Sequence, residues 1–295
     1  MNSLEVLTKI YKPYNVIVKG NTTIFKCTSG NYAIKKKCNK DIRELYNYLN
    51  SRNFNYYPEL IEDNRDEVNV YEYIEDASIS DEQKLFDLID IISLLHNKTS
   101  YYKEITNDKI KTIYEDLLGR VSFIEDSLNK LIFEIEDSVF VSPSCSLLLI
   151  NSSKVFESLV FLKKEIEEWY KLSLDSNKMR VSLLHNNLSL EHYVRNDKEY
   201  LISWDNYTID TPILDIVKLY KKIYLKMDFS EPLKIYMDKF TLTEVEKKLL
   251  FIMLVLPDEI VLSNNEVNNV FIVRSYLDYI YKTENLIKSY YNMND

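Results

Sequence analysis

Two histidines, His185 and His192, are the first residues in this sequence whose types and spacing could do chemistry. Imidazole nitrogens are common zinc ligands, and Glu191 or Asp205 would add a carboxylate as the third ligand. However, the chain lacks the His-x-x-x-His spacing of a helical zinc site, and no cysteine stands near these histidines. For His185 we therefore favour the alternative, a buried structural histidine whose ring bonds the local backbone, Asp205 or Asp215.

A second candidate is the pairing of Lys35 with Glu44, nine residues further along the chain. Lys35 opens a run of three lysines at the end of an apolar–polar alternation, where successive side chains point to opposite faces. One lysine should therefore point inward while its neighbour points to solvent, and an inward Lys35 could pair with the Glu44 carboxylate or with the carboxylate nearest Ser203. The alternative is a solvated lysine cluster after a strand, with Glu44 exposed on its helix.

The elements that would position these residues follow from the periodicity of the apolar side chains. In residues 1–75 the alternating pattern of strands prevails, and one stretch with helical spacing begins at Asp41, a residue type favoured as an N-cap. From Ser80 onward the spacing is helical, except for a polar, β-rich part at 181–209. The strands are expected at 15–19, 23–28, 32–36, 59–62 and 68–74, and the first helix at 41–50. We therefore predict an α+β fold with a small antiparallel β lobe carrying one helix, residues 1–75, and a larger, mainly α-helical lobe, residues 76–295.

Composition excludes several classes of protein. The 295 residues carry a formal net charge of −9, which argues against a general nucleic-acid binder and against an anionic membrane surface as the partner. The three cysteines include no Cys-x-x-Cys pair, so a disulfide framework is not expected. The N-terminal residues lack the pattern of a signal peptide, and the longest apolar run, 249–256, is too short to span a bilayer. We expect a cytoplasmic protein.

Short strings in the N-terminal part resemble the aminoglycoside/choline-kinase-like phosphotransferases, which have a protein-kinase-like fold of two lobes. Tyr32–Lys35 (YAIK) resembles the strand whose lysine contacts the nucleotide phosphates, and Glu44 stands where that family places the carboxylate that pairs with this lysine. VYEYI, which includes Glu72 and Tyr73, resembles the strand and hinge that hold the adenine ring. The resemblance thus implies a nucleotide site that includes these four residues.

The most specific part of the resemblance lies in the C-terminal half. Ile92–His96 (ISLLH) resembles a helix end typical of the group, including its spore-coat members. His185–His192 (HNNLSLEH) resembles the catalytic loop His-x-Asp-x-x-x-x-Asn, and Ile202–Asp205 (ISWD) resembles the metal-binding strand Ile-Asp-Trp-Glu/Asp. Asp210 and Asp215 resemble the acidic residues that open the next helix. Three residues of this part are expected to be structural: His185, Trp204 and Asp215.

The departures from the family pattern fall on the residues that do chemistry. Asn187 stands where the family has the aspartate that accepts the proton of the substrate hydroxyl, and a neutral amide cannot accept it. His192 and Ser203 stand where the family has its two magnesium ligands, although Mg²⁺ prefers carboxylate and other oxygen ligands. If residues 201–205 are extended, Asp205 points to the same face as Ser203 and could serve as a displaced metal ligand.

Three functions are compatible with this pattern. The one we favour is a pseudokinase, a protein without robust catalysis that acts as a scaffold or regulator through an unidentified protein partner, in the manner of spore-coat relatives. The second is an active small-molecule phosphotransferase that uses Asp205. The third is a nucleotide-sensing module that works without magnesium. ATP is accordingly a possible ligand, whereas bound Mg²⁺ is not expected.

Overall fold

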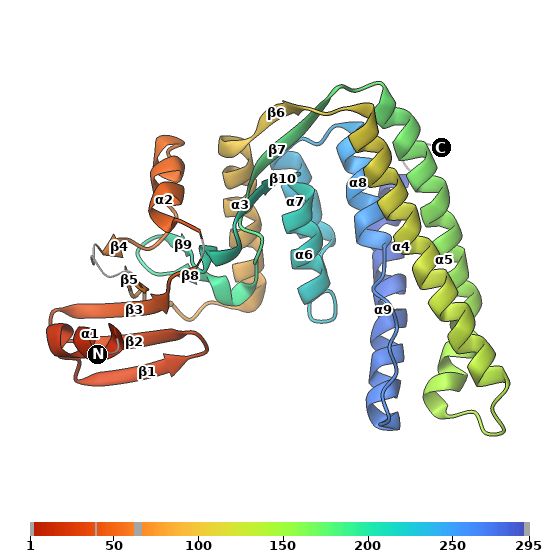
Figure 1. Cartoon of the computed structure of the whole chain (residues 1–295), viewed down its shortest axis with the longest axis horizontal. Helices are drawn as coiled ribbons and strands as arrows, with labels where there is room; N and C mark the ends of the chain where they lie inside the picture. The colour runs from red at the N-terminus through yellow and green to blue at the C-terminus, as the bar shows by residue number, and fades with distance from the viewer. Residues whose placement is uncertain (1–2, 39, 62–66, 292–295) are drawn as a thin grey trace. The chain divides into compact units, whose positions relative to one another are not determined.

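The computed structural model describes residues 3–38, 40–61 and 67–291 of the chain (Figure 1). Contacts divide the chain into two compact units, each built from two separate segments. The first unit comprises Met1–Ser100 and Leu183–Ile209, and the second comprises Tyr101–Ser182 and Asp210–Asp295. The lobe boundary expected after residue 75 stays a prediction, because units defined by contacts need not coincide with lobes.

A five-stranded antiparallel sheet forms the β-structure of the first unit, which confirms the prediction from the alternating pattern. Its strands, in spatial order, are β1 (Asn15–Lys19), β2 (Thr22–Cys27), β3 (Gly30–Lys36), β5 (Val68–Glu72) and β4 (Leu60–Ile61). Gly20, in the turn between β1 and β2, has a φ of 54°, a value that glycine adopts without a Cβ clash. Strand β3 pairs with β5 so that Lys35 lies opposite Asn69. Lys35 therefore extends from the central strand of the sheet.

Helix α2 (Ile42–Ser51) follows this sheet and matches the predicted helix. The Asp41 side chain caps it by accepting hydrogen bonds from the backbone N–H groups of Arg43 and Glu44, at 2.8 and 3.3 Å. The buried face of the helix has the expected spacing of i, i+3, i+4 and i+7. Its residues are Ile42, Leu45, Tyr46 and Leu49.

The sequence analysis missed helix α1 (Ser3–Tyr11), which gives the N-terminal residues a second helix. Leu7 of α1 is fully buried and packs in a cluster with Phe25 of β2, Ile34 of β3 and Val70 of β5. Leu4 and Tyr11 pack against the same cluster, so the segment has the i, i+3, i+7 spacing of a helix, which the sequence analysis did not use.

Two short strands pack with a long helix in the rest of the first unit. Helix α3 (Asp81–Thr99) is capped by the Ser80 side chain, and β8 (Tyr193–Arg195) pairs with β9 (Glu199–Leu201). Asp87 of α3 lies 3.0 Å from the Tyr193 hydroxyl and accepts a hydrogen bond of 2.9 Å from Arg195. The Arg195 backbone N–H donates to Asp76, which also pairs with Lys84. The segment after β5 is therefore tied to both β8 and α3.

The second unit is mainly helical. Its elements are β6 (Tyr101–Glu104), α4 (Asn107–Glu136), α5 (Pro143–Leu174), β7 (Lys178–Leu184), α6 (Ile213–Ile223), α7 (Ser230–Lys239), α8 (Glu244–Val255) and α9 (Glu266–Tyr291). Strand β6 pairs antiparallel with β7, whose last two residues belong to the first unit. Glu246 closes a capping box with Thr243 at the start of α8 and also pairs with Arg180 of β7 at 2.6 Å. The Glu246 carboxylate thus anchors α8 to strand β7.

Among the helices that the structure describes, α5 is long and apolar enough to cross a membrane, judged by length and composition alone. This helix differs from the run at 249–256 on which the sequence analysis relied. Core helices of soluble proteins pass the same test, so the finding is weak evidence. Helix α5 contacts α4, α8 and α9, and Leu148, Val155 and Ile166 are among its fully buried residues. Helix α5 therefore packs along one face against these helices, while 22% of its apolar window is buried.

Glu266, at the start of α9, caps the start of α5. Its carboxylate accepts hydrogen bonds from the Ser144 backbone N–H at 2.7 Å and from the Ser144 hydroxyl at 3.0 Å. The backbone bond, followed by the hydroxyl bonds, holds the pKa of Glu266 below its ordinary value. Because the ionised form is favoured in the folded state, this interaction stabilises the fold above the unfolded-state pKa and is lost as the pH falls.

We expect Glu266→Gln to lower the melting temperature at pH 7, and the deficit to shrink as the pH falls below the ordinary glutamate pKa. Thermal denaturation of both proteins between pH 4 and pH 7 measures this difference. The matched control is Glu136→Gln, which removes an exposed carboxylate from the end of α4. A deficit of equal size at every pH would contradict the assignment to the charged form.

Candidate functional site

A cavity of about 300 Å³ lies in the first unit, between the sheet, α2 and the segment from residue 191 to 205. Its walls are aliphatic and aromatic, and the aromatic side chains come from four separate elements. They are Tyr46 of α2, Tyr71 of β5, Tyr73 after β5, and Trp204 in the turn after β9. A volume near 300 Å³ with mostly apolar walls is at the small end of the range for ligand pockets. The cavity is therefore the candidate site in this unit.

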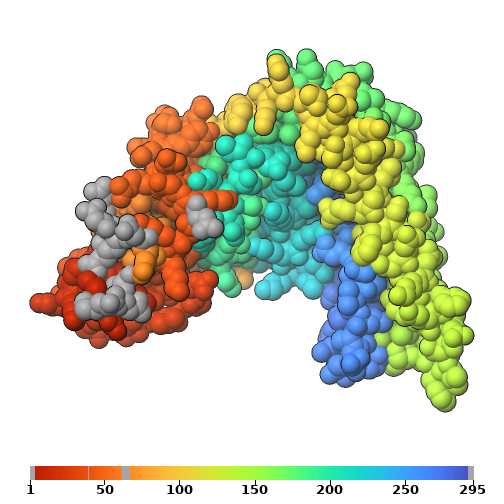
Figure 2. Space-filling model, in the orientation of Figure 1, coloured from red at the N-terminus to blue at the C-terminus, as the bar shows by residue number. Residues whose placement is uncertain are grey.

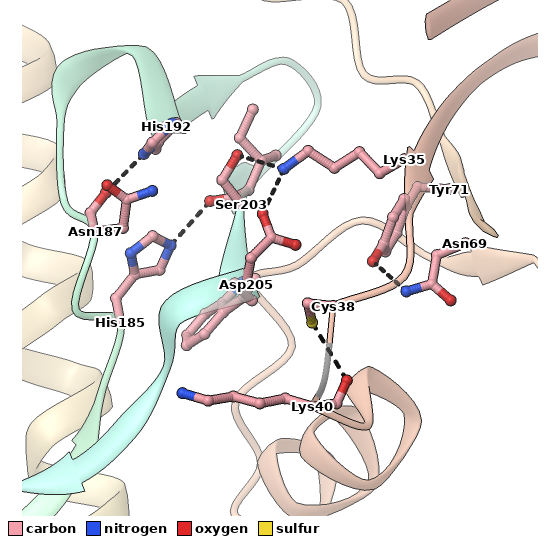
Figure 3. A network of polar contacts seen from close by, with 12 residues as sticks. Lys35, Cys38, Lys40, Asn69, Tyr71, His185, Asn187, His192, Ser203 and Asp205 are labelled. Atoms are coloured by element: carbon pink, nitrogen blue, oxygen red, sulfur yellow. Dashed lines mark hydrogen bonds and ion pairs between the residues drawn. The ribbon is translucent and has the colours of Figure 1, made fainter. Parts of the chain in front are cut away.

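Lys35 supplies the charge at the centre of the cavity. Its ammonium donates hydrogen bonds to the Asp205 carboxylate at 2.7 Å and to the Ser203 hydroxyl at 3.1 Å (Figure 3). The Lys35 side chain is 18% exposed and that of Asp205 is 32% exposed, so water reaches the pair only in part. Of the two arrangements considered for Lys35, the inward one is observed.

The predicted pair of Lys35 with Glu44 is not formed among the residues that the structure describes. Glu44 lies in the first turn of α2, where its side chain is exposed. The inward side of this helix instead presents Tyr46 to the cavity. The carboxylate that meets Lys35 is Asp205, which lies 170 residues further along the chain. This carboxylate is the one nearest Ser203, which the sequence analysis considered as the alternative partner of Lys35.

The segment around Ser203 is not extended, contrary to the condition under which Asp205 was considered as a ligand. Strand β9 ends at Leu201, Ser203 has left-handed backbone angles (φ 66°, ψ 51°), and Trp204–Asn206 form a 3-10 turn, η2. A left-handed conformation costs a residue with a Cβ of the order of 1 kcal/mol or more, so surrounding contacts must maintain it. The Trp204 indole N–H donates to the Leu201 carbonyl at 2.8 Å. This turn brings Ser203 and Asp205 to the same ammonium.

The rings of His185 and Trp204 pack against each other at this turn. His185 is fully buried, its Nε2 lies 2.9 Å from the Ile202 carbonyl oxygen, and its ring centroid is 4.7 Å from that of Trp204. Trp204 is also buried and makes an edge contact with Phe54. Asp215, the third residue expected to be structural, is fully buried in the first turn of α6 in the second unit.

His192 is bound to the loop that contains Asn187. Its Nδ1 lies 2.6 Å from the Asn187 backbone carbonyl oxygen (Figure 3). A carbonyl oxygen only accepts hydrogen bonds, so Nδ1 carries the proton. The centroids of the His185 and His192 rings are 6.2 Å apart. Within the described part of the chain, no group of three histidine, cysteine, aspartate or glutamate side chains is placed to hold a metal ion.

Glu72 and Tyr73, which the resemblance assigns to the hinge, both line the cavity. Their backbone N–H groups donate to the carbonyl oxygens of Glu59 and Asn31, each at 3.0 Å. These bonds hold the end of β5 at the edge of the cavity. The structure therefore brings Glu72, Tyr73 and Lys35 into one site.

Sequence reasoning missed several other residues that line the cavity. Tyr46 reads as a core position of its helix, whereas Tyr71 entered only as part of the string that resembles the strand and hinge, and burial raises the pKa of both phenols. Lys19 of β1, Asp76 and Glu191 also line the cavity. Glu191 was weighed only as a zinc ligand. A cavity wall has the same apolar periodicity as a core, so the pattern alone does not separate the two.

Comparison with known proteins identifies the fold. No family model matches the chain, and no curated protein matches it. Among solved structures, an aminoglycoside phosphotransferase from Alicyclobacillus acidocaldarius subsp. acidocaldarius is similar with a TM-score of 0.70 at 10% sequence identity, over 95% of this chain and 92% of that one. An AMP-bound spectinomycin phosphotransferase is similar with a TM-score of 0.53 at 12% identity, over 97% and 93% of the two chains. The chain therefore has the two-lobed protein-kinase-like fold of the aminoglycoside phosphotransferases, as the sequence analysis predicted.

Proposed function

We propose that this protein is a pseudokinase: it retains the ligand cavity of the kinase-like fold, lacks robust phosphoryl transfer and acts as a cytoplasmic scaffold or regulator. The observation that carries the proposal is the contact of Lys35 with Ser203 and Asp205. At the position of a family metal ligand, Ser203 offers only a hydroxyl, and that hydroxyl already binds the ammonium. A divalent cation would have to compete with Lys35 for both oxygen donors.

The catalytic loop supports the same proposal. Asn187 has a neutral amide where the resemblance requires a base, and loss of a general base usually lowers a rate by about 10²–10⁴. His192, at the other metal position, presents imidazole nitrogens, of which Nδ1 is occupied by the loop backbone. The two defects affect proton removal and metal binding separately, so neither repairs the other.

A protein partner is supported by exposed apolar residues in the second unit. The turn between α4 and α5, at the yellow-green end of this helix pair in Figure 2, contains Val139 and Phe140, each 89% exposed. Phe133, at the end of α4, is 70% exposed. Three strongly exposed apolar side chains near one turn favour a contact with another protein there. The spore-coat resemblance suggests an assembly as the setting, which makes the partner a structural or regulatory protein.

An active phosphotransferase is the second candidate, because Asp205 lines the cavity with its carboxylate beside Lys35. If a nucleotide drew Lys35 toward its phosphates, Asp205 would be released to bind a metal ion. The structurally similar proteins are phosphotransferases by name, which keeps this candidate open.

ATP consumption in the presence of Mg²⁺ separates the two candidates. We expect no turnover above about 0.01 s⁻¹ with sugar, aminoglycoside or choline-like acceptors, since typical enzymes reach about 1 s⁻¹ or more. Asp205→Asn is assayed beside the unmodified protein. Turnover at an ordinary enzymatic rate that is lost in Asp205→Asn would refute the pseudokinase and make Asp205 the metal ligand.

Restoring the family residues should restore metal binding. We expect the triple variant Asn187→Asp, His192→Asn and Ser203→Asp to bind ATP in a Mg²⁺-dependent manner, which the unmodified protein does not. Nucleotide-induced thermal stabilisation with and without Mg²⁺ is the measurement, and ligand at 100 times its dissociation constant adds about 2.7 kcal/mol.

Asn187→Asp alone is the control for the triple variant, because it restores the base without the metal ligands. Mg²⁺-dependent binding by this single variant, or by the unmodified protein, would contradict the assignment of His192 and Ser203 as the lost ligand positions.

A further inference from the structure

We infer that the cavity selects an uncharged nucleoside over a nucleoside triphosphate when no metal ion is present. This inference rests on the proposed function, since it specifies which ligand a cavity without magnesium would take. It separates the base-binding role of the site from the phosphate-binding role that the resemblance implies.

The charges that line the cavity favour a ligand without phosphates. Two lysines face four carboxylates there. Lys35 is neutralised by Asp205 at 2.7 Å, and Asp76 is paired with Lys84. The residues that remain are Lys19, Glu72 and Glu191. The net charge of these three side chains is −1. The phosphates of a nucleoside triphosphate would therefore enter a cavity that is already negatively charged.

A phosphate bound by Lys35 would either lie beside Asp205 or displace it. A phosphate oxygen at the ammonium would lie close to the Asp205 carboxylate, and like charges at that separation repel each other. Alternatively, Lys35 would have to leave Asp205, which is only 32% exposed and would then be a partly buried, unpaired carboxylate. Either course lowers the affinity for a polyphosphate, and neither affects a ligand that leaves this contact alone.

The walls of the cavity suit the base and the sugar of a nucleoside. Tyr73 provides half-buried aromatic surface, and Tyr46, Tyr71 and Trp204 line the cavity although each is less than 10% exposed. Aromatic rings stack on nucleobases with little dependence on sequence or charge. The volume of about 300 Å³ is at the lower limit for drug-sized ligands, which agrees with a ligand smaller than a triphosphate. Binding by stacking and burial needs no metal ion.

Calorimetric titration with adenosine, AMP and ATP in a chelating buffer tests the inference. We expect adenosine to bind at least about tenfold more tightly than ATP, with AMP between them. In Asp205→Asn the ammonium is released, so the affinity for ATP should rise and the ratio of the two dissociation constants should change by at least about tenfold. Glu82→Gln, which removes an exposed carboxylate from the first turn of α3 outside the cavity, should leave the ratio unchanged.

Lys35→Met provides a second test if Asp205→Asn does not fold, as judged by circular dichroism. It removes the ammonium and leaves the carboxylate, so ATP binding should weaken further while adenosine binding is retained. ATP that binds the unmodified protein as tightly as adenosine would overturn the inference and leave the proposed pseudokinase intact. Absence of binding by all three ligands at millimolar concentration would overturn the inference together with the retained ligand cavity. Mg²⁺-dependent turnover would refute the pseudokinase itself.

Discussion

The contact of the Lys35 ammonium with Asp205 and Ser203 is the interaction on which the candidate site depends. It joins the central strand of the sheet to a turn 170 residues later in the chain. A charge pair at this depth is stable only while both partners are held in register, because removing either leaves a partly buried charge. The sheet holds Lys35, and the left-handed Ser203 with the 3-10 turn holds Asp205. The contacts of Asp76 with Lys84 of α3 and with Arg195 of β8 hold the segment after β5 against these two elements.

The walls of the cavity also form part of the core. Trp204 is buried against His185 and Phe54, and Tyr46 lies on the buried face of α2. Replacing such residues costs packing energy whether or not a ligand binds. The shape of the cavity therefore depends on packing as well as on any ligand.

The sequence predicted those parts of the structure that follow from local periodicity. The sheet and α2 were found because alternation and helical spacing are properties of a few adjacent residues, and Asp41 marked the start of its helix. Helix α1 was missed although Leu4, Leu7 and Tyr11 have helical spacing, because the strand pattern that follows dominated the N-terminal residues. Of the two partners considered for Lys35, Glu44 was suggested by its closeness in sequence and the carboxylate nearest Ser203 by the resemblance, and the structure shows the second. The extended conformation considered for residues 201–205 is not observed, because serine gives no signal of a positive φ where glycine or asparagine would.

The bond between His192 and the Asn187 carbonyl bears on how easily this protein could change in evolution. The donor atom of a histidine Nδ1 and the amide nitrogen of an asparagine stand the same number of bonds from the backbone. An asparagine at this position could keep the tie to the loop with its nitrogen and turn its oxygen toward a cation. Under the proposed loss of a magnesium ligand at this position, a change of His192 to asparagine would not require the loop to be rebuilt.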